Sequence, residues 1–145
     1  VLALGSTEPI KSGLSLAETI EAIKDLGGLA ILAHPFSPLV PRERNLSVLM
    51  ALDAVEVVNS REILFHFSCW MARKLARALG KPMTGGSDAH CPEAIGSAYT
   101  IVEAGPSIDD VLEAVRKGFT EPVGRRMKFR HMVKKWACMK ISASP

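Results

Sequence analysis

The side chains in this sequence best suited to bind a metal ion lie directly after two apolar segments. Asp88 and His90 stand on alternate residues, just after a predicted strand that ends near Gly86. Side chains on alternate residues of an extended chain point to the same side, so these two groups can converge on one cation. His34 follows a second apolar run, residues 29–32, in the same end-of-strand position. The spacing therefore predicts that His34, Asp88 and His90 lie together.

Imidazole and carboxylate ligands together suit Zn, Mn or Fe(II) better than Ca, which prefers oxygen ligands alone. Three such groups around a metal with an open position would lower the pKa of a bound water and supply hydroxide near neutral pH. Pro35 disfavours helical backbone at His34, which predicts an extended conformation suited to a fixed ligand. The alternative interpretation is that His34 is a packed strand-end histidine whose ring hydrogen-bonds to the backbone.

Alternating helix and strand signals predict the scaffold that positions these side chains. Two capping boxes, each a serine followed three residues later by an acid, precede amphipathic segments. Continuous apolar runs are typical of strands that are buried on both faces. The predicted helices are 16–26 after Ser15, about Phe67 to Leu79, and 108–117 after Ser107, and the predicted strands are 1–4, 29–33, 54–58, 82–86 and 98–102.

Short connections between these elements indicate an α/β fold with a mainly parallel sheet, because parallel neighbours need a helical crossover. Functional groups in such sheets collect at the carboxyl ends of the strands. His34, Asn59 and Asp88 each follow a predicted strand. Three separate connections are therefore expected to supply polar groups to one face of the sheet.

The composition fits one soluble domain, with 145 residues of which 48% are apolar and 23% are charged. No apolar run reaches the roughly 18 to 20 residues that a membrane span requires, which predicts a cytoplasmic protein without a membrane partner. The three cysteines are odd in number and lack a C-x-x-C spacing, which argues against a disulfide framework or a zinc ribbon.

The charge is uneven along the chain, which predicts a domain at 1–123 and a basic, helical tail at 124–145. Seven basic residues and no acid lie between Gly124 and Lys140, whereas the remainder has 11 basic residues (18 less the seven) against 15 acidic ones. A helix with a solvated basic face is the interpretation we favour for the tail over a nucleic-acid site, because Phe129 and Trp136 offer little base stacking.

Three sequence blocks resemble the polymerase and histidinol phosphatase (PHP) family of metal-dependent phosphoesterases. They are GGLAILAHPF, AVEVVNSR and GKPMTGGSDAHCPEAIGSAYT, in that order and spacing. The resemblance implies a distorted (β/α)7, TIM-like barrel that holds divalent metal ions (Mn, Zn, Fe or Mg) at its C-terminal rim. His34, Asp88 and His90 match metal-ligand positions. Asn59, Arg61 and Ser87 lie where rim residues of the family meet the substrate phosphate.

The chain also departs from the family pattern, since the His-x-His motif and other early ligands of the family are not in this sequence. Cys69 stands where we expect Asn, and His66, a candidate replacement ligand, is interpreted as a partly buried structural residue between two phenylalanines. The chain is therefore interpreted as a partial barrel, the C-terminal portion of a phosphoesterase that acts on a phosphorylated small molecule or nucleotide. The alternative is a metal-poor PHP-like module that binds nucleic acid or a partner protein.

Overall fold

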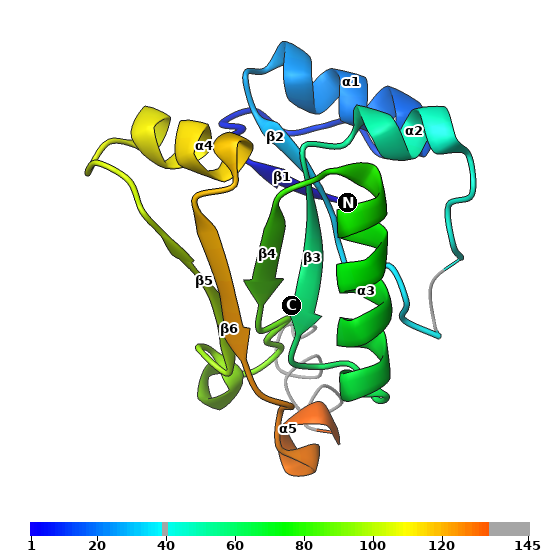
Figure 1. Ribbon diagram of the computed structural model, residues 1–145, viewed down its shortest axis with the longest axis vertical. Helices are drawn as coiled ribbons and strands as arrows, with labels where there is room; N and C mark the ends of the chain where they lie inside the picture. Colours follow the sequence, from blue (N-terminus) through cyan, green and yellow to red (C-terminus); the bar gives the residue numbers. More distant parts are fainter. Residues whose placement is uncertain (39–40, 134–145) are drawn as a thin grey trace, which may run out of the picture.

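The computed structural model of the protein describes residues 1–38 and 41–133 (Figure 1). Its helices and strands alternate along the chain, as the sequence predicts. The strands are β1 (Leu2–Leu4), β2 (Leu29–Leu32), β3 (Ala54–Asn59), β4 (Met83–Gly86), β5 (Ala98–Val102) and β6 (Thr120–Gly124). The helices are α1 (Leu16–Asp25), α2 (Leu46–Ala51), α3 (Phe65–Leu79), α4 (Ile108–Lys117) and α5 (Phe129–Val133), with a 3-10 turn η1 (Pro92–Ala94).

The main sheet has the strand order β1-β2-β3-β4 and mixes both strand directions. β2, β3 and β4 run parallel, with Ile31 opposite Ala54 and Val55 opposite Met83, whereas β1 pairs antiparallel with β2. Helical crossovers join the parallel strands, and the carboxyl ends of β3 and β4 both point toward α5 (Figure 1). The predicted α/β class is confirmed, in the form of a curled half-barrel sheet of four strands with flanking helices.

Beyond β4 the parallel pattern stops, because β5 and β6 form a separate antiparallel pair. The Thr100 hydroxyl accepts a hydrogen bond from the Gly85 amide and donates one to the Gly85 carbonyl, each 2.9 Å long. One side chain thus satisfies both backbone groups at this point of the β4 edge. Thr120 Oγ1 similarly donates to the Met83 carbonyl. A closed (β/α)7 barrel is accordingly not confirmed by the part of the chain that the structure describes.

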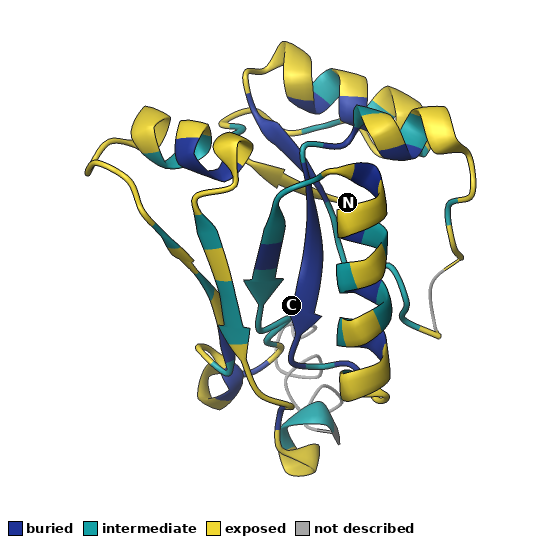
Figure 2. Cartoon of the chain, in the orientation of Figure 1, coloured by how far each residue is buried: buried dark blue, intermediate teal, exposed yellow. Residues whose placement is uncertain are grey.

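The core lies on both faces of β3, in which every residue is buried (Figure 2). One face packs with Ala72 and Ala76 of α3, whose small side chains let the helix approach the strand. Ile20 and Ile23 of α1 pack with Ala30 of β2 in a neighbouring cluster. The helices therefore hold the strands, and with them the strand ends, in fixed positions.

Local capping signals predict the helix ends well. Both capping boxes form as predicted, at Ser15 and at Ser107. α3 begins at Phe65, slightly earlier than expected, and ends at Gly80, whose φ of +62° suits glycine. Within the described residues, no helix has the length and apolar character needed to cross a membrane.

Two described elements are not predicted by the sequence analysis. The helix α2 is capped by Asn45, whose side chain accepts from the Ser47 amide at 3.1 Å. The strand β6 contains Pro122, which cannot donate to a ladder and is therefore a weak strand signal. Of the predicted helical tail, α5 lies in the described part. Lys134, Lys135, Trp136, Met139 and Lys140 lie outside the described residues.

Candidate functional site

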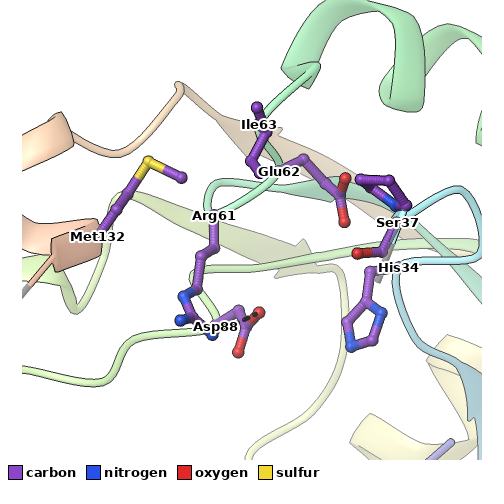
Figure 3. A pocket seen from close by; sticks show the side chains of 8 residues that line it. His34, Ser37, Arg61, Glu62, Ile63, Asp88 and Met132 are labelled. Carbon is purple, nitrogen blue, oxygen red and sulfur yellow. Dashed lines mark ion pairs between the residues drawn. The ribbon is translucent and has the colours of Figure 1, made fainter. Parts of the chain in front are cut away.

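Polar residues that follow three neighbouring strands meet at one cavity of about 330 Å³. His34 follows β2, Arg61 follows β3, and Asp88 follows β4. Ser37 and Glu62 also line the cavity, and Figure 3 shows these side chains around it. Of the three residues predicted to meet, His34, Asn59 and Asp88, the first and last line this cavity, and Arg61 lines it where Asn59 was expected.

The backbone at two of these positions differs from the extended conformation that the sequence predicts. His34 has φ +29° and Asp88 has φ +48°, and among the described non-glycine residues only these two have positive φ. A turn replaces extended chain at His34, whose carbonyl accepts from the Ser37 amide at 3.1 Å. Strained backbone of this kind costs on the order of 1–3 kcal/mol and clusters at functional sites. Asp88 and His90 are therefore not brought together by strand alternation.

Arg61 links Asp88 and His90 instead. Its Nη1 atom lies 3.9 Å from Asp88 Oδ2 and donates to His90 Nε2 at 3.2 Å. A guanidinium can only donate, so Nε2 accepts and the neutral His90 ring carries its proton on Nδ1. Nδ1 in turn donates to the Asp88 carbonyl at 2.9 Å. A fixed positive charge therefore lies against two of the predicted metal ligands.

His34 is held by its backbone, while one nitrogen of its ring has no partner. The His34 amide donates to Glu56 Oε2 at 2.7 Å. Nδ1 of the ring is buried without a hydrogen bond, and within residues 1–38 and 41–133 it is the single buried side-chain nitrogen or oxygen in this state. Leaving such an atom unsatisfied costs about 1–3 kcal/mol. This unsatisfied nitrogen sets His34 apart from the other buried polar side chains of the described residues.

The buried carboxylate of Glu56 organises the floor of the site. It accepts from the His34 amide and from Asn59 Nδ2, the latter at 3.0 Å. Burial raises the pKa of Glu56 above its usual 4.5, and the two hydrogen bonds oppose this shift. A Cβ at Gly86 would lie 2.7 Å from Glu56 Oε1, so glycine leaves room for the carboxylate.

Asn59 and Ser87, the other predicted substrate-binding residues, make contacts within the protein. The buried Asn59 side chain donates to Glu56 and accepts from the Arg61 amide at 2.9 Å. The Ser87 carbonyl accepts from the Ser60 hydroxyl at 2.8 Å. Asn59 thereby positions two neighbours in the site, and contact of either residue with a substrate phosphate stays a prediction.

The sequence analysis missed Glu56 and Glu62. Glu56 is the one charged residue in the run 54–58, which is otherwise apolar, and a charge inside a fully buried strand is a signal that could have identified it. Glu62 is 6% exposed and accepts from the Ser68 hydroxyl at 3.1 Å. The sequence around Glu62 gives no comparable signal, because Glu62 lies in a turn between β3 and α3 outside any apolar run.

His66 and Cys69 lie on α3 beside the site. His66 is exposed and makes an edge-on contact with Phe65, so the expectation that it is partly buried is wrong. The first turn of α3 directs it to solvent. Cys69 is half-buried, and burial raises the pKa of its thiol. With Asn59 and Glu56 it surrounds a small hollow behind the cavity.

The donor chemistry of the site fits a divalent cation, although the donors are not grouped. His34 and His90 supply imidazole nitrogens, and Asp88 supplies carboxylate oxygens. Nδ1 of the His34 ring has no hydrogen-bond partner and is the candidate ligand atom of that side chain. Across the described residues, no three His, Cys, Asp or Glu side chains are close enough to hold one ion together. The metal-ligand roles of these three residues stay predictions.

The fold and the site together define an α/β half-barrel whose strand ends carry a polar cavity. Residues 66–120 match the family model described as PHP-associated. The PHP relationship that the sequence motifs predict is therefore confirmed for this segment, which contains Asp88 and His90.

Two known proteins are similar to this chain, one in sequence and one in structure. The uncharacterized protein MJ1587 of Methanocaldococcus jannaschii is 45% identical over 60 residues, which cover 41% of this chain and 35% of that protein. The crystal structure of PsfC from Pseudomonas syringae PB-5123 matches with a TM-score of 0.63 at 20% identity, over 94% of this chain and 56% of PsfC. The latter match shows a shared fold. The chain thus spans little more than half of PsfC, and the matched region is about a third of MJ1587.

Proposed function

We propose that this chain supplies the C-terminal part of a PHP-type phosphoesterase site, at which water hydrolyses a phosphate ester. The observation that carries the proposal is the meeting of His34, Arg61 and Asp88 in one cavity. The PHP-associated match over the segment that holds Asp88 and His90 supports it. Phosphorylated small molecules or nucleotides are the proposed substrates.

His34, Asp88 and His90 would hold the metal, which is Mn, Zn, Fe or Mg. When bound, a divalent metal lowers the pKa of a water molecule and offsets negative charge on the phosphate. His34 and Asp88 line the same cavity (Figure 3), and Nδ1 of His34, which is buried without a hydrogen-bond partner, is the proposed ligand atom of that side chain.

Arg61 would bind the phosphate of the substrate. A guanidinium pairs with two phosphate oxygens at once and stabilises charge that develops during in-line attack. Asn59 holds this arginine in place, because its side chain accepts from the Arg61 amide. Glu56 in turn fixes Asn59 and the His34 backbone. Two buried side chains beside the cavity, Asn59 and Glu56, therefore orient the groups that would meet the ester.

The test measures Mn²⁺-dependent hydrolysis of p-nitrophenyl phosphate by the full natural protein that carries this sequence. We expect Asp88→Asn to lower kcat/KM on the order of a hundredfold or more. Asp25→Asn removes an exposed carboxylate at the end of α1 and serves as the matched control, with activity like the parent. Equal activity of Asp88→Asn and the parent would rule the proposed function out.

A metal-poor module that binds nucleic acid or a partner protein is the second candidate. The observation that favours it is Arg61, which already neutralises Asp88 and bonds to His90. In that case the full protein would turn over no phosphate ester with any of the four metals, although Arg61→Ala would still weaken ligand binding at the cavity.

A further inference from the structure

A second cavity, of about 420 Å³, lies between η1 and the segment that follows β6. Its size is in the usual range for small-molecule sites. The lining is strongly basic, with one acidic side chain and one serine beside the cations. The lining includes Arg125, Arg126, Lys128, Arg130, Glu93 and Ser97.

The backbone under these cations is firmly held. The Arg125 amide donates to the Ser97 carbonyl at 2.9 Å, and the Met127 amide donates to the Ser60 carbonyl at 2.7 Å. Met127 is 4% exposed and packs against Cys91 and Ala94. Because the Met127 side chain is anchored in the core, its neighbours in the chain are presented at the surface in fixed positions. A preorganised display of this kind lowers the entropy cost of binding.

The cations of this cavity form no ion pair with another described residue, in contrast to cations elsewhere. Lys24 pairs with Asp53, and Arg116 and Lys117 pair with Glu113. In the described part of the chain, no ion pair involves Arg125, Arg126, Lys128 or Arg130. Cations gathered in one hollow repel each other and create a positive potential that an anion would relieve.

We propose that this basic cavity binds a phosphoryl group. Arginine forks match the oxygen geometry of phosphate bidentately, and Lys128 adds a point charge. No Phe, Tyr or Trp side chain lines the cavity, and its one aromatic ring is the imidazole of His131, which accepts a hydrogen bond from Arg130 Nε at 3.1 Å. The cations outnumber this single ring, so the phosphate is the group that the cavity recognises. The phosphate can come from a free phosphorylated small molecule or from the backbone of a single-stranded nucleic acid, and the site is separate from the cavity at His34.

The experiment uses the 145-residue chain with two probes, inorganic phosphate by calorimetry and a labelled short oligothymidylate by fluorescence anisotropy. The double variant Arg126→Gln/Lys128→Gln removes two exposed cations of the cavity. Arg116→Gln/Lys117→Gln removes the same charge from the exposed face of α4 and is the matched control. Thermal unfolding confirms that each variant is folded.

We expect at least one probe to bind the parent chain and the cavity variant to bind it at least about tenfold more weakly, as for loss of charge-assisted hydrogen bonds. The affinity of the control variant for each probe should stay within about twofold to threefold of the parent's, because single exposed charges contribute little.

Binding of phosphate identifies a small-molecule site, whereas binding of the oligonucleotide alone identifies a backbone site with a log-log salt slope near −0.7 per contact. Binding of neither probe, or an equal loss in both variants, would overturn the proposal. Arg126→Lys keeps the charge and should restore part of the affinity lost by Arg126→Gln.

Discussion

Asp88 sits in a backbone conformation that most residues avoid, with φ +48°, and its side chain faces the candidate site. His34, on the opposite side of the same cavity, shares this feature. Two strained non-glycine residues at one cavity lower the stability of the fold, and strain of this kind is typical of functional sites. Arg61 and Glu56 then determine the charge around them.

We predict that Asp88→Gly is more stable than Asp88→Ala by about 1 kcal/mol, because only alanine places a Cβ at positive φ. Both variants remove the carboxylate, so the comparison isolates the backbone. The measurement is the free energy of unfolding in urea.

Glu21, an exposed residue inside α1, provides the opposite comparison. There the alanine variant should be more stable than the glycine variant by about 1 kcal/mol, owing to helix propensity. The same order at both positions would contradict a strained backbone at Asp88.

Among the elements, α1 depends on its capping box. The Ser15 hydroxyl accepts from the Glu18 amide, and the Glu18 carboxylate accepts from both the Ser15 amide and its hydroxyl. These hydrogen bonds lower the pKa of Glu18 from its usual 4.5. The carboxylate therefore stabilises the folded state above pH 4.5, and this contribution is lost as the pH falls through the lowered pKa.

We predict that Ser15→Ala costs about 1 kcal/mol of stability at pH 7, as removal of an N-cap typically does. The difference between Ser15→Ala and the parent should shrink at acidic pH, because protonated Glu18 no longer contributes to the box. Urea unfolding at neutral and acidic pH measures both effects. Glu21→Gln, on the same helix but outside the box, is the control, and a Ser15→Ala penalty that grows on acidification would refute the linkage.

The parallel part of the sheet ends at β4, and β5 packs closely on this strand. Thr100 satisfies the Gly85 amide and carbonyl with one hydroxyl, and Gly85 lets the β5 backbone approach. A Cβ at Gly85 would lie 3.0 Å from the Tyr99 carbonyl. The close packing of the β5–β6 pair on β4 therefore depends on a glycine and a threonine that are far apart in sequence.

For the molecule as a whole, the half-barrel brings two cavities to α5. Met132 lines the cavity at His34, and His131 lines the basic cavity. The first holds metal-capable groups and the second holds cations.

We predict that residues 1–145 alone retain Mn²⁺ weakly and hydrolyse p-nitrophenyl phosphate slowly. The described residues hold no group of three close metal-capable side chains, and Arg61 competes for Asp88 and His90. Metal analysis after dialysis should give well under one ion per chain. Stoichiometric Mn²⁺ that is lost in Asp88→Asn but kept in Asp25→Asn would show that the three predicted ligands form a complete site by themselves.

The sequence by itself determined most of the elements, α2 and β6 apart, and the strand ends that carry polar side chains. Capping at Ser15 and Ser107 depends on residues three positions away, and the buried strands are marked by their own apolar runs. These signals are local, so a single sequence contains them. The positions of His34, Arg61 and Asp88 at one rim follow from the parallel order of the strands that precede them.

Tertiary structure alone decided how those side chains are used. Glu56 faces the site because β3 is covered on both faces, and Arg61 bonds to His90 across 29 positions of sequence. The positive φ of Asp88, the antiparallel β5–β6 pair and the basic cavity likewise depend on contacts between distant segments. Local sequence does not encode such contacts, because their energy comes from packing and charge pairing that exist only once the chain has folded.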